Sequence, residues 1–214
     1  MFKILIFVGL VPCVITILVA TLFGSRRVAS KLEVGFTGRQ LAKMILKGKN
    51  IEIKEKASWW SGLNPFDGDS LKISKAMLEQ KTLYNSVQVI HRCGLALLQE
   101  VHEGSVNKYY HTMRFVSIVP IFMIVASVLG KVIGRYSFGV CLTVAVWGIA
   151  LACLACVFNF MTSREAVKRA LHELDKKNAF KRMSDQEQVE NAAFGFVYMQ
   201  IAPPLMGPLV KWKE

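Results

Sequence analysis

One stretch of the chain carries residues at a spacing that could bind a metal ion. A helix with histidines at positions i and i+4 and a glutamate at i+1 aims two imidazoles at one zinc ion and holds a base for its water. In the stretch SVQVIHRCGLALLQEVH, residues 86–102, His91 occupies the first of these positions. Arg92 stands in place of the base and Leu95 in place of the second histidine. The chemistry to consider is zinc-dependent hydrolysis, with one motif ligand present.

Other side chains are poorly placed to complete such a site. His102 shares a helical face with His91, but eleven residues of straight helix separate them by about 16 Å. Cys93 lies on a different face of that helix, and His111 and His172 could approach only through the tertiary fold. No nucleophile-elbow sequence or phosphate-binding glycine loop is present.

Composition indicates a membrane protein. The 214 residues are 53% hydrophobic yet carry a net charge of +12, which is typical of apolar spans joined by basic loops. Residues 4–23, 115–130 and 138–161 carry no charge, and about twenty apolar residues cross a bilayer. Residues 192–210 are also uncharged but contain three prolines, which favours a fourth span or an interfacial or re-entrant segment.

The distribution of Lys and Arg predicts the orientation. Of the 27 such residues, segment 25–114 holds fifteen and segment 162–191 holds seven. The positive-inside rule therefore places both segments in the cytoplasm and the N-terminus outside. The basic surface is explained by insertion and by contact with anionic lipid, without a nucleic acid. The five cysteines lie in spans or in the helix of His91, so a disulfide framework is not expected.

Local patterns supply the elements between the spans. Thr37 is expected to cap a helix that ends at Gly48, and residues 51–53 and 71–73 read as short strands, the second as an edge strand. A helix is predicted over 75–101. In the third span Gly148, Ala152 and Cys156 make a small-residue face that also carries Asn159.

The predicted fold is a mainly α membrane protein with three to four transmembrane helices and a cytoplasmic α+β segment. The expected segments are 1–24, an N-terminal anchor; 25–114, the cytoplasmic α+β segment with the motif helix 75–101; 115–161, a transmembrane hairpin; 162–191, a cytoplasmic charged helix; and 192–214, a C-terminal apolar segment.

The order of these parts resembles the integral-membrane neutral zinc metallopeptidases of bacteria, the YugP type. Their T-G-x-x-x-A-x-x-[IL]-L helix is similar to residues 37–46, and their Y-D-P…L-S pattern to residues 66–74. Their first motif histidine follows that serine by seventeen residues, as His91 follows Ser74, and a glycine follows three residues later, as Gly94 does. Further similar positions are Arg114 and Pro120 at the opening of the second span and residues 159–166, which parallel E-F-D-A-S-R-R-A.

The resemblance implies a site and also implies its loss. In the family, two histidines and the glutamate of the E-F-D segment are expected to hold zinc, and the glutamate after the first histidine activates water. The matching residues here are His91, Leu95 and Asn159 for the metal and Arg92 for the base. A leucine binds no zinc, an amide oxygen is a poor donor for it, and a guanidinium stays protonated. We therefore expect no catalytic residue and no cofactor, and Arg92 is hypothesised to hydrogen-bond Asn159 in place of the metal.

Three functions remain open from the sequence. The first is a pseudoprotease that has lost zinc binding and proteolysis and acts as a scaffold or binds a partner, such as a membrane protein or an active paralogue. The second is an active membrane zinc metallopeptidase with unconventional ligands. The third is a small non-enzymatic adaptor or transport protein, although its spans carry little charge. In each case the lipid bilayer is a partner, and the bacterial cytoplasmic (inner) membrane is the expected location.

Overall fold

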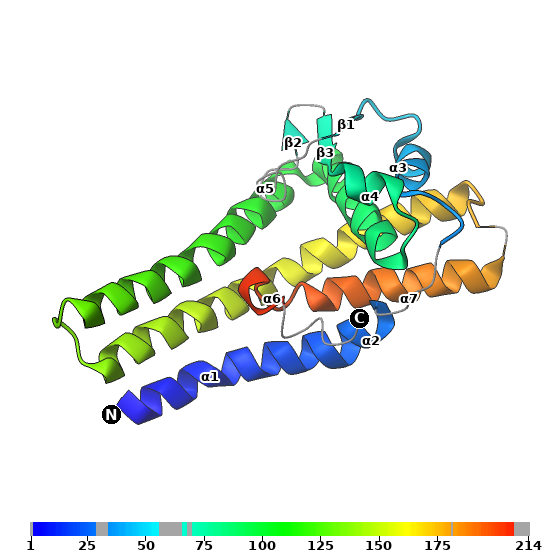
Figure 1. Ribbon diagram of the computed structural model, residues 1–214. Helices are drawn as coiled ribbons and strands as arrows, with labels where there is room; N and C mark the ends of the chain where they lie inside the picture. Colours follow the sequence, from blue (N-terminus) through cyan, green and yellow to red (C-terminus); the bar gives the residue numbers. More distant parts are fainter. Residues whose placement is uncertain (1, 29–33, 56–65, 68–69, 181, 208–214) are drawn as a thin grey trace.

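The computed structural model describes residues 2–28, 34–55, 66–67, 70–180 and 182–207. It is mainly helical, with a three-stranded sheet. Figure 1 shows two parts: long helices that lie side by side, and a compact end built from shorter elements. We call the first part the band and the second the head.

The band consists of three helices that are long and apolar enough to cross a membrane. They are α1 (Phe2–Val19) with its π-helical continuation η1 (Ala20–Ser25), the second half of α5 (Leu83–Val132), and the first half of α6 (Phe138–Lys176). Large apolar side chains on these helices face outward, and Phe158 is 81% exposed. Such a surface suits lipid and would aggregate in water. The prediction of an integral membrane protein with three long apolar helices is confirmed.

Close contacts between small residues hold the band together. A Cβ on Gly9 of α1 would lie 2.8 Å from Val146 of α6, so this glycine allows a close approach. Trp147 donates from Nε1 to the Leu5 carbonyl at 3.2 Å. Cys13 and Cys153 are buried in one cluster with alanines, including Ala20 and Ala150.

The head encloses a core of large aliphatic side chains. Its elements are α2 (Arg26–Val28), α3 (Gly38–Leu46), β1 (Glu52–Glu55), β2 (Phe66–Asp67), β3 (Ser70–Ile73), α4 (Lys75–Glu79) and α7 (Met183–Met199). The short η3 (Pro204–Met206) follows α7, and its Met206 is buried with Cys13 and Cys153 of the band. The core also takes in the first half of α5 and the second half of α6; it includes Leu41, Ile45, Leu71, Ile73, Val87, Ile90, Val167, Leu174 and Val189. Segments far apart in sequence therefore share one interior.

Of two local predictions for the head, one is confirmed and the other is wrong. Thr37 caps α3 through a capping box with Gln40, and Gly48 follows with φ of +87°, as the sequence predicts. The strand at 71–73 is not an edge strand, because β3 lies between β1, which is parallel to it, and β2, which is antiparallel. All four β3 residues are buried, so its backbone groups pair on both sides.

The predicted helix 75–101 consists of two helices in the structure, and the second of them continues into the following span. Ser74 caps the short α4, Thr82 caps α5, and α5 then runs on into the band. It is interrupted at His102, whose φ of −136° and ψ of 61° are not helical. In a straight helix Tyr109 would lie about 27 Å beyond His91, yet their ring centroids are 6.0 Å apart. The interruption therefore folds the second half of α5 back across the first.

The charged segment 162–191 is not one helix. Residues up to Lys176 continue α6 directly from the band, and the helix ends where Asn178 adopts a positive φ of 45°. A separate helix, α7, starts at Met183 and packs along α6, α5 and η1. Lys177 donates to the carbonyls of Met44 and Ile45 at the end of α3, where a cation is favourable.

The fourth-span alternative for residues 192–210 is not supported by the described residues. The helix that contains Ala192 ends at Met199, and the chain turns before Pro203 and Pro204. Prolines cannot donate the backbone hydrogen bonds that would continue the helix. Residues 208–214 lie outside the described ranges, and residues 183–199 carry acidic side chains that suit a head helix better than a span.

Candidate functional site

Gly94 sets the position of the candidate site, because it allows α5 and α6 to cross closely in the head. A Cβ added to Gly94 would lie 2.0 Å from the Ala166 carbonyl oxygen, so any larger residue would push the helices apart. His91 lies one turn before Gly94 on α5, and Ser163 lies one turn before Ala166 on α6. The crossing therefore brings these two side chains together.

His91 is the first member of a buried hydrogen-bonded chain. Its Nε2 lies 2.7 Å from Ser163 Oγ. Ser163 Oγ lies 2.8 Å from Gln200 Oε1, and Tyr109 donates its hydroxyl to the same oxygen at 3.1 Å. Ser163 Oγ can donate to His91 Nε2 or accept from it, so the contact is compatible with either neutral tautomer of His91. We call these four residues the His91 chain; they join α5, α6 and the end of α7.

Burial keeps the His91 imidazole neutral. Only 3% of its surface is exposed, and the rings of Tyr109 and Phe196 flank it. Burial first, and then the neighbouring Arg92 guanidinium, lowers the pKa of His91 to about 3. Its Nε2 lies 2.7 Å from Ser163 Oγ, so a metal ion would have to displace this contact to bind that nitrogen.

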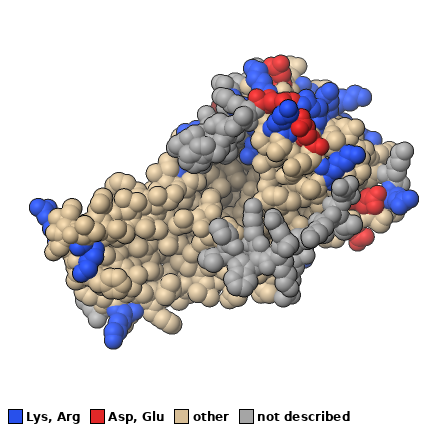
Figure 2. All heavy atoms as spheres, viewed as in Figure 1, with Lys and Arg blue, Asp and Glu red and all other residues tan. Residues whose placement is uncertain are grey.

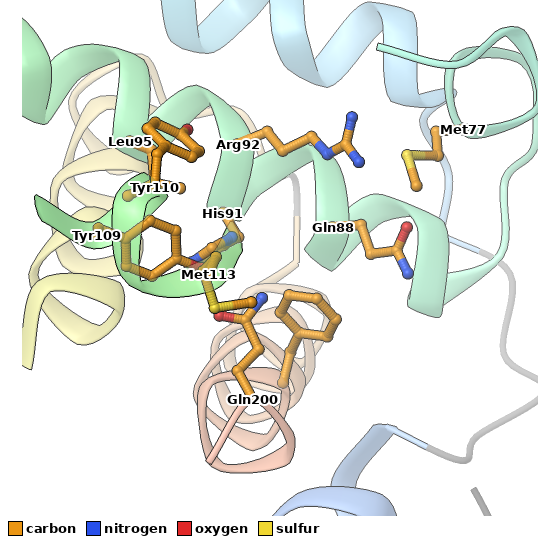
Figure 3. A pocket seen from close by; sticks show the side chains of 10 residues that line it. Met77, Gln88, His91, Arg92, Leu95, Tyr109, Tyr110, Met113 and Gln200 are labelled. Atoms are coloured by element: carbon orange, nitrogen blue, oxygen red, sulfur yellow. The ribbon is translucent and has the colours of Figure 1, made fainter. Parts of the chain in front are cut away.

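Arg92 turns away from the His91 chain. Its Nη1 donates to the Lys72 carbonyl of β3 at 3.2 Å, and Figure 3 shows its side chain extending toward Met77 rather than toward His91. Adjacent helical residues point about 100° apart, so a side chain next to His91 does not face α6. The hypothesis that Arg92 hydrogen-bonds Asn159 is therefore wrong.

Asn159 has another partner. It is 8% exposed, and its Nδ2 donates to the Tyr109 carbonyl at 3.3 Å. The predicted face is confirmed, since Gly148, Ala152 and Cys156 are buried with it. Leu95 is buried among Leu98, Val106 and the two tyrosines 109 and 110. The structure thus places His91, Leu95 and Asn159 around one helix crossing, with apolar packing and amide hydrogen bonds there.

The other potential ligands lie elsewhere. His102, His111 and His172 are exposed, and Cys93 is buried in the head core. Within the described ranges, no group of three or more His, Cys, Asp and Glu side chains is arranged to hold a metal ion.

Sequence reasoning missed three members of the His91 chain. Ser163 could have been found, because it lies one turn after Asn159 and continues the small-residue face. Tyr109 could not, because its approach depends on the interruption at His102. Gln200 is brought in by α7 packing against α5 and α6, which no local pattern predicts.

A pocket of about 190 Å³ lies beside the His91 chain. It is shown in Figure 3, and its lining residues are Met77, Gln88, His91, Arg92, Leu95, Tyr109, Tyr110, Met113, Phe196 and Gln200. His91, Tyr109 and Gln200 thus contribute to one part of the wall, while Arg92 and Gln88 supply polar groups outside the His91 chain. One part of the pocket wall is therefore formed by hydrogen-bonded side chains, and another part carries the Arg92 cation.

Comparison of the chain with protein-family models, with curated proteins and with solved structures finds no match.

Proposed function

We propose that this chain is a membrane-embedded, metallopeptidase-like protein without peptidase activity, which acts by binding a partner. The observation that carries the proposal is the 2.7 Å contact between His91 Nε2 and Ser163 Oγ. It engages the one motif histidine in a structural hydrogen bond. Hydrolysis by a zinc site needs an open metal position and a base that accepts a proton from water. Leu95 and Arg92 supply neither.

The arrangement supports retention of the scaffold without its chemistry. In the resemblance, a metal would join the α5 and α6 helices at this crossing. Here the His91 chain joins the same helices and also α7. A fully satisfied buried network specifies a unique arrangement of helices. A rigid head on a membrane band is suited to scaffolding, and the partner proposed is a membrane protein or an active paralogue.

The proposed location is the bacterial cytoplasmic (inner) membrane, with segments 25–114 and 162–191 on the cytoplasmic side. The excess of Lys and Arg in these segments supports it. The two segments also share one core, which requires the same side for both. Figure 2 supports a lipid-facing band, because on this face an uncharged zone separates basic residues at one tip from both signs of charge over the head.

Metal content tests the proposal directly. Full-length protein purified in detergent without added metal should contain far less than one zinc per chain, and casein cleavage should not respond to a chelator. His111→Ala is the matched control for adventitious binding, because His111 is an exposed histidine on the same helix. One zinc per chain that is lost in His91→Ala but kept in His111→Ala would contradict the proposal.

The resemblance has its own test. Leu95 lies one turn after His91 on α5, and Asn159 lies one turn before Ser163 on α6. The triple variant Arg92→Glu, Leu95→His, Asn159→Glu should therefore bind about one zinc per chain if these positions surround a former metal site. The same triple variant with His91→Ala serves as the control. Equal zinc content in the two would show that these positions do not form one site.

A further inference from the structure

The Arg92 guanidinium is a cation in the wall of the pocket. In the part of the chain that the structure describes, no Asp or Glu forms an ion pair with it, and its one hydrogen-bond acceptor is the Lys72 carbonyl. A guanidinium has five N–H donors in a planar fork that matches carboxylate and phosphate oxygens. Most of these donors are therefore available to a bound group.

Gln88 provides a second polar group in the same wall. It lies one turn before Arg92 on α5, and among the residues that the structure describes its buried Oε1 has no hydrogen-bond partner. Figure 3 shows the Gln88 amide on the same side of the pocket as Arg92. The oxygen and nitrogen of a glutamine amide are interchangeable by rotation, so this amide can present its N–H donors instead. A buried amide with an unpaired atom indicates a missing partner.

The size and position of the pocket limit what fits. At about 190 Å³ it is smaller than the roughly 300–1,000 Å³ typical of sites that enclose a drug-sized ligand. Met113 and Leu95 give it apolar wall, and Met113 lies two residues before the uncharged run that starts at Phe115. The pocket thus lies near the end of the band. It accommodates a small head group and not a whole lipid.

We propose that this pocket binds the oxyanion head group of an amphipathic anion, with Arg92 as the recognising cation and Gln88 as a further donor. The shared chemistry is a phosphate or carboxylate carried by an apolar tail. A metal ion is bound by electron-donating side chains, whereas an arginine guanidinium in a pocket wall binds carboxylate or phosphate groups. The inference rests on the proposed function, because it requires a site at which no metal cation is bound.

Binding is tested on full-length protein in a neutral detergent by native mass spectrometry. The probes are dioctanoyl phosphatidylglycerol, oleate, inorganic phosphate and uncharged dioctanoylglycerol. We expect phosphatidylglycerol or oleate to bind at least about tenfold more tightly than either of the other two, a factor that corresponds to one charge-assisted hydrogen bond. The tighter of the two anions identifies the source. Equal binding of dioctanoylglycerol, or inorganic phosphate binding as tightly as both amphiphiles, would overturn the proposal.

Variants locate the binding. Arg92→Gln should weaken binding of the preferred anion about tenfold or more, whereas Arg164→Gln should leave it unchanged. Arg164 is the matched control because it adjoins Ser163 but its side chain is exposed. Arg92→Lys, which keeps a cation without the planar fork, and Gln88→Leu should each weaken binding several-fold. These two variants decide the matter if Arg92→Gln does not fold.

Unchanged affinity in Arg92→Gln, or in both Arg92→Lys and Gln88→Leu, would exclude this pocket. Zinc content is measured on the same preparations. Stoichiometric zinc contradicts the proposed function, whereas zinc-free protein that binds no anion contradicts only the present inference.

Discussion

The band and the head are stabilised in different ways although two helices, α5 and α6, run through both. In the band, Phe122 and Phe158 are 70% and 81% exposed, and contacts between helices rely on small residues such as Gly9. In the head, Leu41, Leu71 and Leu174 are fully buried. Lipid already solvates apolar side chains, so the band gains from close backbone packing, whereas the head gains from removing aliphatic surface from water. Along both α5 and α6, stabilisation therefore changes from close backbone packing in the band to burial of aliphatic side chains in the head.

Gly94 is an exception to this difference between the two parts, because here the head uses the close helix packing typical of the band. Gly94→Val should destabilise the protein by at least about 3 kcal/mol, because even a Cβ would lie 2.0 Å from the Ala166 carbonyl oxygen. Thermal unfolding in detergent measures the loss. Gly104→Ala is the control: it lies on the same helix with no atom near its added Cβ, and should be neutral or stabilising by up to about 1 kcal/mol. Equal effects of the two would show that the crossing is not tight.

A lysine introduced on the surface of each part tests whether the band, unlike the head, faces lipid. Phe122→Lys places a cation in the middle of the band and should reduce membrane insertion by about 2.5–3 kcal/mol. The fraction of chain resistant to carbonate extraction reports it. Met183→Lys is the matched change in the head, at a side chain that is 88% exposed, and should alter stability by less than about 0.5 kcal/mol. Insertion that is insensitive to Phe122→Lys would count against a lipid-facing band.

The stability of the head should depend on pH through His91. Burial lowers the pKa of His91 from 6.5 to about 3, so only the unfolded state takes up this proton between those values. Stability is then complete above pH 6.5 and falls as the pH drops toward 3, by about 2 kcal/mol at pH 5. The titratable groups that act on the imidazole are Tyr109, whose ring flanks it, and Arg92, whose charge acts from the next position on α5; neither titrates in this range.

Chemical unfolding of wild type and His91→Gln at pH 8 and pH 5 measures this effect. His91→Gln keeps a hydrogen-bonding group for Ser163 but does not titrate, so it should lose about 2 kcal/mol of the pH dependence. His111→Gln, at an exposed position, should retain the wild-type dependence. An unchanged slope in His91→Gln would place the pH sensitivity elsewhere.

The smallest effect concerns a local feature of the head. Thr37→Ala removes the side chain that accepts from the Gln40 N–H in the capping box, and should cost about 1 kcal/mol. The control is Thr112→Ala on α5, where the hydroxyl donates to the Lys108 carbonyl within a helix that already pairs its backbone. Hydrogen exchange at the start of α3 should accelerate in the first variant only. A silent Thr37→Ala would mean that packing alone holds α3.

Patterns in the sequence predicted the features that depend on near neighbours. The three uncharged runs predict three long apolar helices because lipid solvation is a property of each segment. Thr37 and Gly48 predict the ends of α3, and Gly148, Ala152 and Cys156 predict the buried face of α6, because helical geometry fixes both. The proposal of a metallopeptidase-like ancestry and the loss of its chemistry stay predictions, which the zinc and variant measurements test.

Features that depend on distant contacts were predicted incorrectly or not at all. The edge position of β3 was wrong because strand order depends on which segments pair. The contact of Arg92 with Asn159 was wrong because α6 approaches the opposite face of α5, at Gly94. The sequence did not predict that α5 continues into the span, because the polar residues 102–114 do not indicate such a continuation.

The sequence by itself determined that the chain carries three apolar helices, that its positive charge gathers in two segments, and that His91 lacks the usual companions of a zinc ligand. The tertiary structure alone decided what His91 does instead. It joins Ser163, Gln200 and Tyr109 because one helix crossing and one backbone interruption bring residues from three helices within hydrogen-bond distance. Residue types set which bonds are chemically available, and only packing in three dimensions sets which of them form.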